Sequence, residues 1–512
     1  MSVRVVSASQ AAEMDAAAIA AGVPSRALMQ AAGRAAAELI LARYPLESSR
    51  GVALYAGPGN NGGDAWVAAA ELARRGVRVR VTEVSPSRTS DAKAEREAAS
   101  AVLTHTRPDG SEGVIVDGLL GTGAHGAPHG VVAEAIERIG LLRSHGRNDV
   151  RVVALDVPSG VDATTGETPG VHVRAHLTVT FGMMKRGLLV NRDAAGAIMV
   201  VDIGLGATAP SGDAMPLVDA AFVRDAVPPI LAAAHKGTRR RLAIVGGAEG
   251  MAGSTILAAR GAMRSGIGMV KLVVASGSVA AVQSAEPAAM CARWPAADAE
   301  FAGIYEWADV LIVGPGLGQG PAARTFAERL LREWRGPVVL DADGLNAFAG
   351  DAVVLGRLLA GRPAVITPHA AEFARLAGVK PGDVNARRFE IAAELARTIH
   401  ATVLLKGVPT VVSDGTATDV SASGTPVLAT AGSGDVLGGI VATLLAQGSD
   451  ARRSAAAAAW IHGRAAEIAG AGRVRGVDLD DVIGALRDAW RLEVPQLPAP
   501  VLAELPAVGE SF

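Results

Sequence analysis

A glycine-rich turn that opens into an apolar helix holds the residues best suited to chemistry in this chain. It spans 430–439 and reads Thr-Ala-Gly-Ser-Gly-Asp-Val-Leu-Gly-Gly. Glycines let the backbone approach an anion closely, and free N–H groups at a helix N-terminus attract phosphate. Asp435 lies in the first helical turn, where its carboxylate can take a proton from a substrate hydroxyl beside that anion. A plain helix cap, in which the acid complements the helix dipole, is the alternative interpretation.

Further motifs in the second half of the chain each follow an apolar run that predicts a strand. They span 246–253, 313–318, 341–346, 367–372 and 406–410. Because the carboxyl ends of parallel strands meet at one edge of a sheet, these motifs can line one crevice. Asp341, Asp343 and Glu372 are candidates to bind magnesium, directly or through water. Lys406 can neutralise phosphate charge.

Three loops in the first half of the chain also follow expected strands, at 57–64, 117–123 and 156–162. The first loop has neither the spacing of a dinucleotide fingerprint nor the lysine of a P-loop. It offers instead the amide oxygens of Asn60 and Asn61 and the carboxylate of Asp64, and oxygen ligands of this kind suit a hard cation. Strand-to-helix turns with side-chain caps are the alternative for each loop taken alone.

Apolar strand-like runs alternate with amphipathic helical runs throughout, which predicts α/β domains with parallel sheets covered by helices. In the first half we expect strands at 52–56, 77–81, 113–116, 152–155, 177–181 and 198–202, after a helix pair over 8–42 that is broken at 22–24. In the second half we expect strands at 242–245, 269–274, 310–313, 338–341, 364–367 and 402–406, and a hairpin formed by 410–413 and 417–420. We place a domain boundary between 225 and 226 and a Pro-rich, loosely attached or disordered tail at 493–512.

Composition narrows the class of protein. The 512 residues carry 49 Lys and Arg against 51 Asp and Glu, a net charge of −2, which argues against nucleic acid or an anionic membrane as partner. The single cysteine excludes an intramolecular disulfide and a cysteine-rich metal site. The N-terminus lacks the apolar core of a signal peptide, and no apolar stretch is long enough to span a bilayer. We expect a cytoplasmic homo-oligomer whose partners are small molecules.

The loops of the first half, taken in order, resemble the NAD(P)H-hydrate epimerase domain, which has a Rossmann-like three-layer fold and binds potassium. The resemblance implies that Asn61, Asp117 and Ser159 hold the ion and that Asp156 is the catalytic acid–base residue. It also implies substrate contacts from Asn60, Asn61, Gly62, Gly63, Asp64, Gly121, Thr122, Gly123, Ala124, His125, Gly126, Ala127 and Asp156. The chain departs from the family pattern at Ala65 and at 124–129, where His125 and His129 can equally be solvated. Lys185 resembles a family lysine near the site, with an ordinary surface lysine as the alternative.

The second half resembles the ribokinase-like NAD(P)H-hydrate dehydratase domain, over about 235–490. The resemblance implies that the hydrated nucleotide meets Ala252, Gly316, His369 and Asp435, with Asp435 as the catalytic base. It assigns ADP or AMP to Lys406, Gly407, Val408, Pro409, Thr410 and Gly434. The family commonly has Pro-Gly where this chain has Ala370 and Ala371.

Together the two resemblances imply a bifunctional repair enzyme with an epimerase domain at 1–225 and a dehydratase domain at 226–492. Hydrated NAD(P)H carries a hydroxyl at nicotinamide C6 in S and R forms. The first domain would interconvert them, and the second would phosphorylate the S form with ADP and magnesium and release phosphate, giving NAD(P)H and AMP. The alternatives are a small-molecule kinase fused to a Rossmann-like nucleotide-binding module, and a first domain that only binds nucleotide or serves as a scaffold.

Overall fold

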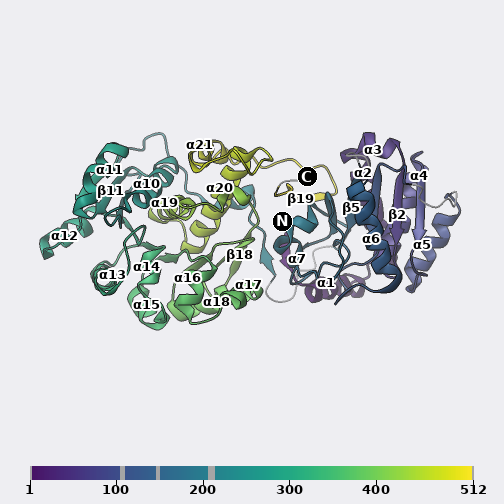
Figure 1. Cartoon of the computed structure of the whole chain (residues 1–512), viewed down its shortest axis with the longest axis horizontal. Helices are drawn as coiled ribbons and strands as arrows, with labels where there is room; N and C mark the ends of the chain where they lie inside the picture. The colour runs from purple at the N-terminus through teal and green to yellow at the C-terminus, as the bar shows by residue number, and fades with distance from the viewer. Residues whose placement is uncertain (1–2, 104–109, 146–149, 206–213, 510–512) are drawn as a thin grey trace. The chain divides into compact units, whose positions relative to one another are not determined.

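The chain, shown here as a computed structural model, divides into two compact units (Figure 1). The structure describes residues 3–103, 110–145, 150–205 and 214–509. The first unit comprises Val3–Met215 and Pro495–Val508, and the second comprises Pro216–Val494. The unit boundary therefore comes earlier than 225, because helix α9 (Ala220–Ala226) packs against α20 (Ala451–Gly470) of the second unit.

The first unit is built on a seven-stranded sheet. Its strand order is β19 (Val501–Leu505), β8 (Ala197–Val201), β6 (Leu177–Phe181), β5 (Arg151–Leu155), β4 (Val114–Gly118), β2 (Val52–Ala56) and β3 (Val79–Glu83). All neighbours are parallel except β19, which runs antiparallel to β8. A small sheet joins β7 (Met184–Lys185), β1 (Arg4–Val6) and β9 (Met215–Pro216).

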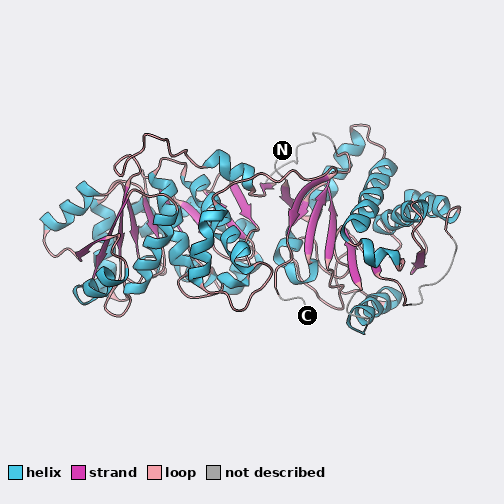
Figure 2. Cartoon of the chain, turned by 90° about the horizontal axis from the view of Figure 1, so that it is seen from above, coloured by secondary structure: helices cyan, strands magenta, loops and turns pink. Residues whose placement is uncertain are grey.

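Helices cover both faces of this sheet, as expected for strands rich in Val, Ile and Leu and buried on both sides (Figure 2). Alternate strand residues such as Leu54 and Val116 pack with α1, α2 and α4, and the intervening ones, such as Tyr55 and Ile115, pack with α6. The helices are α1 (Ala8–Ala20), α2 (Ser25–Arg43), α3 (Pro45–Ser49), α4 (Asn60–Arg74), α5 (Ser90–Ser100), α6 (Gly130–His145), α7 (Arg186–Val190) and α8 (Arg192–Ala195).

The second unit has a nine-stranded sheet. Its order is β12 (Met290–Arg293), β11 (Met269–Val274), β10 (Arg241–Val245), β13 (Val310–Val313), β14 (Val338–Leu340), β15 (Ala364–Ile366), β16 (Thr402–Leu405), β17 (Thr410–Ser413) and β18 (Thr418–Ser421). The first seven run parallel to one another, β17 runs antiparallel to β16, and β17 and β18 form the antiparallel hairpin expected from the sequence. The α/β fold class and the parallel sheets expected from the sequence are confirmed.

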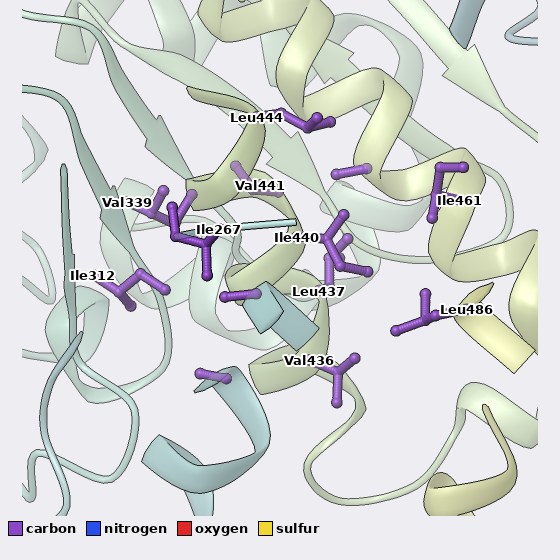
Figure 3. Packing of buried hydrophobic residues seen from close by; sticks show 14 of the residues in the cluster. Ile267, Ile312, Val339, Val436, Leu437, Ile440, Val441, Leu444, Ile461 and Leu486 are labelled. Carbon is purple, nitrogen blue, oxygen red and sulfur yellow. The ribbon is translucent and has the colours of Figure 1, made fainter. Parts of the chain in front are cut away.

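One face of this second sheet carries an extended apolar core (Figure 3). Ile312 and Val339 from the strands pack with Leu437 and Ile440 of α19 and with Leu486 of α21. Besides α9 and α20, the helices are α10 (Ala252–Arg264), α11 (Val279–Ala285), α12 (Asp298–Trp307), α13 (Pro321–Glu333), α14 (Asp343–Asn346), α15 (Ala352–Leu359), α16 (Ala370–Ala377), α17 (Pro381–Ala386), α18 (Arg388–Ile399), α19 (Ser433–Ala446) and α21 (Leu479–Ala489). None of the helices described is long and apolar enough to cross a bilayer.

The expectation of a loosely attached C-terminal tail is wrong for the segment that forms β19. Val501 pairs with Val201 and Leu505 with Ile198, so the end of the chain extends the sheet of the first unit. The Asp202 N–H also donates to the Pro500 carbonyl at 2.8 Å. The high Pro content suggested disorder, but the short run Val-Leu-Ala-Glu-Leu satisfies the open edge of β8 through backbone hydrogen bonds.

Strand order places the predicted motifs at the switch point of each sheet. From β2 the chain moves outward to β3 and then returns to the other side of β2 as β4, and β10, β11 and β13 repeat this pattern in the second unit. The loops after β2 and β4, and those after β10 and β13, therefore leave adjacent strands in opposite directions. Crevices of this kind are where open α/β sheets bind ligands.

Candidate functional sites

A cavity of about 820 Å³ opens at the switch point of the first sheet. Its lining includes Asn60, Asn61, Asp64, Gly121, Thr122, Gly123, Ala124, His125, Asp156 and Lys185, all singled out from the sequence. Gly62 and Gly63 are not in the lining. A Cβ at Gly62 would lie 2.0 Å from the Gly57 carbonyl oxygen, so Gly62 lets the turn close under the site. Gly126 lines a smaller neighbouring cavity together with Ser159, and Ala127 packs against Gly170.

Asp156 is held at the end of β5 in a conformation that few residues other than glycine adopt, with φ of +63°. Its backbone N–H donates to the Val179 carbonyl at 2.7 Å. The Lys185 ammonium donates to Asp156 Oδ1 at 2.6 Å and to the Phe181 carbonyl at 2.8 Å. Lys185 is 3% exposed, so it is a buried partner of Asp156 and not an ordinary surface lysine. Strain of this kind clusters at functional sites.

Asn61, Asp117 and Ser159, the predicted potassium ligands, lie together beside this cavity. Ser159 donates from Oγ to Asp117 Oδ1 at 2.6 Å and from its backbone to Oδ2 at 2.8 Å. The Asn61 amide nitrogen donates to the Leu120 and Leu155 carbonyls, at 2.7 and 3.1 Å. These bonds orient the amide and leave Asn61 Oδ1 buried without a hydrogen-bond partner in the described structure.

This cluster fits a hard cation. An orphaned buried amide oxygen is costly unless something binds it, and a cation would also neutralise Asp117. Burial raises the pKa of Asp117 to about 6, although hydrogen bonds from Ser159 and Leu119 oppose the rise. Carbonyl, amide and carboxylate oxygens are the donors that hard cations prefer.

The structure shows the surroundings of the two places where the chain departs from the family pattern, Ala65 and the segment 124–129. A Cβ on Gly118 would lie 2.6 Å from Ala65 Cβ, so the glycine that ends β4 leaves room for Ala65. His125 is exposed and lies 3.5 Å from Asp162 Oδ2 through Nδ1, and His129 is exposed as well. Both histidines are therefore exposed, and His125 also lines the cavity, so its contact with substrate stays a prediction.

The second site centres on a lysine at the end of β16. The Lys406 ammonium donates to Asp341 Oδ1 at 2.9 Å and lies 3.8 Å from Glu372 Oε2. Burial lowers the pKa of Lys406, but the carboxylates of Asp341 and Glu372 outweigh it and raise the pKa above its ordinary value. A Cβ on Gly434 would lie 3.0 Å from Lys406 Nζ, so the first turn of α19 passes directly beside this charge.

Asp435 joins the same cluster from α19. Burial, followed by the charge of Asp341, raises the pKa of Asp435 to about 7, while a hydrogen bond from Ser254 and the charge of Lys406 oppose the rise. Gly316 adopts φ of +59°, and a Cβ there would lie 2.7 Å from the Met251 carbonyl oxygen and 3.4 Å from Ser254 Cβ. Gly316, the start of α10 at Ala252 and Asp435 therefore surround Ser254.

His369 and Asp343 have structural partners. His369 caps α16, since its Nδ1 accepts from the Ala371 and Glu372 N–H groups, at 3.1 and 3.3 Å. Asp343 Oδ2 accepts from the Gly318 N–H at 3.0 Å, and Oδ1 accepts from the Gln319 and Asn346 amides. The described residues contain no group of three or more His, Cys, Asp or Glu arranged to hold a metal. Magnesium here would depend mainly on phosphate oxygens and water.

Four residues near the two sites were not predicted as site residues from the sequence. Ser254 adjoins a recognised glycine motif, but nothing in the pattern shows that it bonds Asp435. Arg388 donates to the Pro409 carbonyl at 2.5 Å and so supports the loop 406–410. Asp15 lines the first cavity from α1, within an alanine-rich run that gives no chemical signal. His462 of α20 is buried, and burial together with the charge of Lys406 lowers its pKa to about 4.

Comparisons with known proteins agree with this picture. Residues 242–487 match the family described as NAD(P)H-hydrate dehydratase, and residues 25–187 match the YjeF-related protein N-terminus. The bifunctional NAD(P)H-hydrate repair enzyme of Moorella thermoacetica is 36% identical over 480 residues, covering 87% of this chain and 88% of its own length. The enzyme of the same name from Escherichia coli is 33% identical, with coverage of 91% and 90%. This chain belongs to the bifunctional NAD(P)H-hydrate repair enzymes.

A solved structure is similar to part of the chain. The ADP/ATP-dependent NAD(P)H-hydrate dehydratase of Bacillus subtilis, co-crystallised with ATP and Mg²⁺, has a TM-score of 0.48 and 26% identity, over 55% of this chain and 99% of its own. Membership of the repair family confirms the fold and function expected from the sequence, and it decides against the alternative of a small-molecule kinase fused to a nucleotide-binding module.

The raised pKa of Asp435 predicts how dehydration depends on pH. If Asp435 must be ionised to act as base, kcat/KM for the hydrate rises with pH and levels off above about 7. Ser254→Ala removes a hydrogen bond that stabilises the carboxylate, so the rising limb of the pH profile of kcat/KM should move to higher pH. Ser265→Ala, the same change at the other end of α10, is the control and should leave the limb in place. A limb that Ser254→Ala does not move would contradict the role of Asp435.

Proposed function

We propose that the first unit interconverts the S and R forms of hydrated NAD(P)H and that the second unit dehydrates the S form. The observation that carries the proposal is the composition of the two clusters at the switch points. The first cluster consists of Lys185, Asp156 and Asp64, and its carboxyl groups can transfer protons. Lys406–Asp341 with Asp435 combines a cation, a helix N-terminus and a base.

In the second unit, Asp435 takes the proton from the C6 hydroxyl as the hydroxyl oxygen attacks the terminal phosphorus of the nucleotide. A carboxyl group with a pKa of about 7 is well matched to this task near neutral pH. Lys406 and the N–H groups at the start of α19 stabilise charge on the transferred phosphoryl group. Phosphate is a better leaving group than hydroxide. The C6–O bond breaks with its electron pair on the departing phosphate, and C5 loses a proton to water, so that the C5=C6 double bond forms and the dihydronicotinamide ring is restored.

The nucleotide is ADP in this proposal, held by Lys406–Thr410 and Gly434. Arg388 is in close contact with this loop, because a Cβ on Gly407 would lie only 2.5 Å from Arg388 Nη1. Arg388 therefore supports the loop. Magnesium bound to the phosphate oxygens would neutralise their charge and help to orient the nucleotide. Asp341 and Glu372 are the carboxylates placed to contact it or its water shell. A cytoplasmic location and a homo-oligomeric state stay predictions.

In the first unit, Asp156 is the acid–base group that exchanges protons with the C6 hydroxyl. Lys185 fixes its orientation and neutralises its charge. Asn61, Asp117 and Ser159 hold potassium at the base of the loops 57–64 and 117–123. The ion would neutralise the charge of Asp117 and satisfy the buried Asn61 Oδ1.

Substitution of one aspartate in each unit tests the division of labour. Asp435→Asn removes the base and should lower dehydration of the S form with ADP about 10²–10⁴-fold, while interconversion of S and R continues. Asp156→Asn should do the reverse, so that S is repaired and R accumulates. Chromatography of both epimers with time, for each variant, gives the result. Near-normal dehydration by Asp435→Asn, or loss of both activities in either folded variant, would contradict the proposal.

Potassium binding has a readout that is independent of activity. A ligand that binds only the folded state raises the melting temperature with its concentration. Potassium chloride should therefore stabilise the first unit more than choline chloride at equal ionic strength. Asn61→Ala removes the orphaned oxygen and should abolish the difference, whereas Asn60→Ala at the adjacent position serves as the control. An undiminished potassium effect in Asn61→Ala would place the ion elsewhere.

A further inference from the structure

The cavity of the first unit contains more acidic groups than one acid–base residue requires. Asp15, Asp64 and Asp156 line it together with a single lysine, Lys185. They come from three elements: α1, the N-terminal half of α4 and the end of β5. Three carboxyl groups around one ammonium group cannot all be ionised at low cost, so their protonation states must differ.

Asp156 and Asp64 have opposite surroundings. Asp156 accepts from the Lys185 ammonium at 2.6 Å. Asp64 is 8% exposed, and in the described parts of the chain no residue forms a hydrogen bond or an ion pair with its carboxyl group. Burial, followed by the charges of Asp156 and Asp15, raises the pKa of Asp64 well above its ordinary value, and Lys185 opposes this only in part. Asp64 is therefore the group of the pair whose surroundings favour the protonated form, and Asp156 is the group that the Lys185 ammonium neutralises.

The charged groups on neighbouring elements are engaged with other partners. Helix α4 packs against α2 and α5, where Arg26 is paired with Glu95 at 2.6 Å and Ser25 donates to Asp91 at 2.5 Å. On β4, the Asp117 carboxylate accepts from Ser159. These groups do not supply a cation to Asp64.

We propose that Asp64 is a second catalytic acid–base group of the epimerisation and that it serves the face of the nicotinamide ring opposite to Asp156. This rests on the proposed function of the first unit. Two groups with different protonation states, facing one cavity, are what an exchange of a hydroxyl between two faces of a ring requires. Contacts of Asp64 with the substrate are then part of the chemistry and not only of binding.

The step balances with these two groups alone. Asp64 gives its proton to the C6 hydroxyl, the C6–O bond breaks with its electron pair on oxygen, and water leaves. The N1 lone pair forms a C6=N1 double bond. A water molecule then attacks C6 from the other face, the electron pair returns to N1, and Asp156 accepts the proton that the water loses. The opposite epimer reacts by the same path in reverse, with Asp156 as acid and Asp64 as base.

Asp64→Asn in the full-length protein tests the proposal. The amide has the same shape but cannot transfer a proton, so kcat for epimerisation should fall about 10²–10⁴-fold with little change in KM. A residue that only binds substrate would raise KM and leave kcat unchanged. Dehydration of the S form by the second unit should continue, which shows that the second unit is folded and that the hydrate is intact. A wild-type protein without epimerase activity would instead refute the proposed function itself.

Two pH measurements keep the inference testable if Asp64→Asn fails to fold. Epimerisation by the wild-type protein should decline at alkaline pH, because Asp64 must carry its proton to act as acid. Asp15→Asn removes a neighbouring negative charge, which lowers the pKa of Asp64, so this alkaline limb should move to lower pH. Asp193→Asn, an equal charge change at the exposed start of α8, is the matched control. An alkaline limb at the same pH in Asp15→Asn, or a normal kcat in folded Asp64→Asn, would overturn the proposal.

Discussion

In each unit of this protein, one lysine ammonium group is bonded to one aspartate at the carboxyl ends of the strands. Lys185 bonds Asp156 at 2.6 Å, and Lys406 bonds Asp341 at 2.9 Å. Each pair leaves a further aspartate without a full countercharge, Asp64 in the first unit and Asp435 in the second. Burial and the paired carboxylate then raise the pKa of that remaining group. The same electrostatic constraint thus yields an acid in one unit and a base in the other.

Close backbone packing at the switch points makes these pairs possible. A Cβ on Gly57 would lie 1.8 Å from the Leu119 carbonyl oxygen, and one on Gly246 would lie 2.0 Å from the Pro315 carbonyl oxygen. In both units, therefore, the loops that follow the two strands at the switch point are in direct contact through glycine. Larger side chains there would separate the loops and the polar groups that they carry. These glycines are required for the close packing of the loops, and they contribute to the binding sites because that packing brings the polar groups together.

Much of this could be predicted from the sequence, because buried parallel strands have a strong apolar signal. The expected strands 52–56, 177–181, 269–274 and 310–313 have the bounds observed for β2, β6, β11 and β13. The motifs after the strands were recognisable because glycine, Asn and Asp follow apolar runs at fixed positions. Short elements such as β1, β7 and β12 were missed, since two to four residues carry too little pattern to stand out.

Pairings between distant residues could not be predicted from the same pattern. Nothing in the local sequence shows that Ser254 bonds Asp435 or that Asp15 lies near Asp64, because packing of separate elements decides both. The pKa of Asp64 depends on its burial and on the charges of Asp15, Asp156 and Lys185, which come from three other elements. Composition was misleading for the C-terminus, where Pro-rich flanks hide the five-residue strand β19.

The central claim is that one chain repairs both epimers through epimerisation followed by phosphorylation and elimination. The most direct measurement is a time course of the wild-type protein with a mixture of S and R hydrates, ADP, magnesium and potassium. The account predicts that both epimers disappear, that NADH absorbance returns in full, and that phosphate and AMP appear in amounts equal to the hydrate consumed. Persistence of one epimer, or accumulation of a stable phosphorylated hydrate, would contradict it.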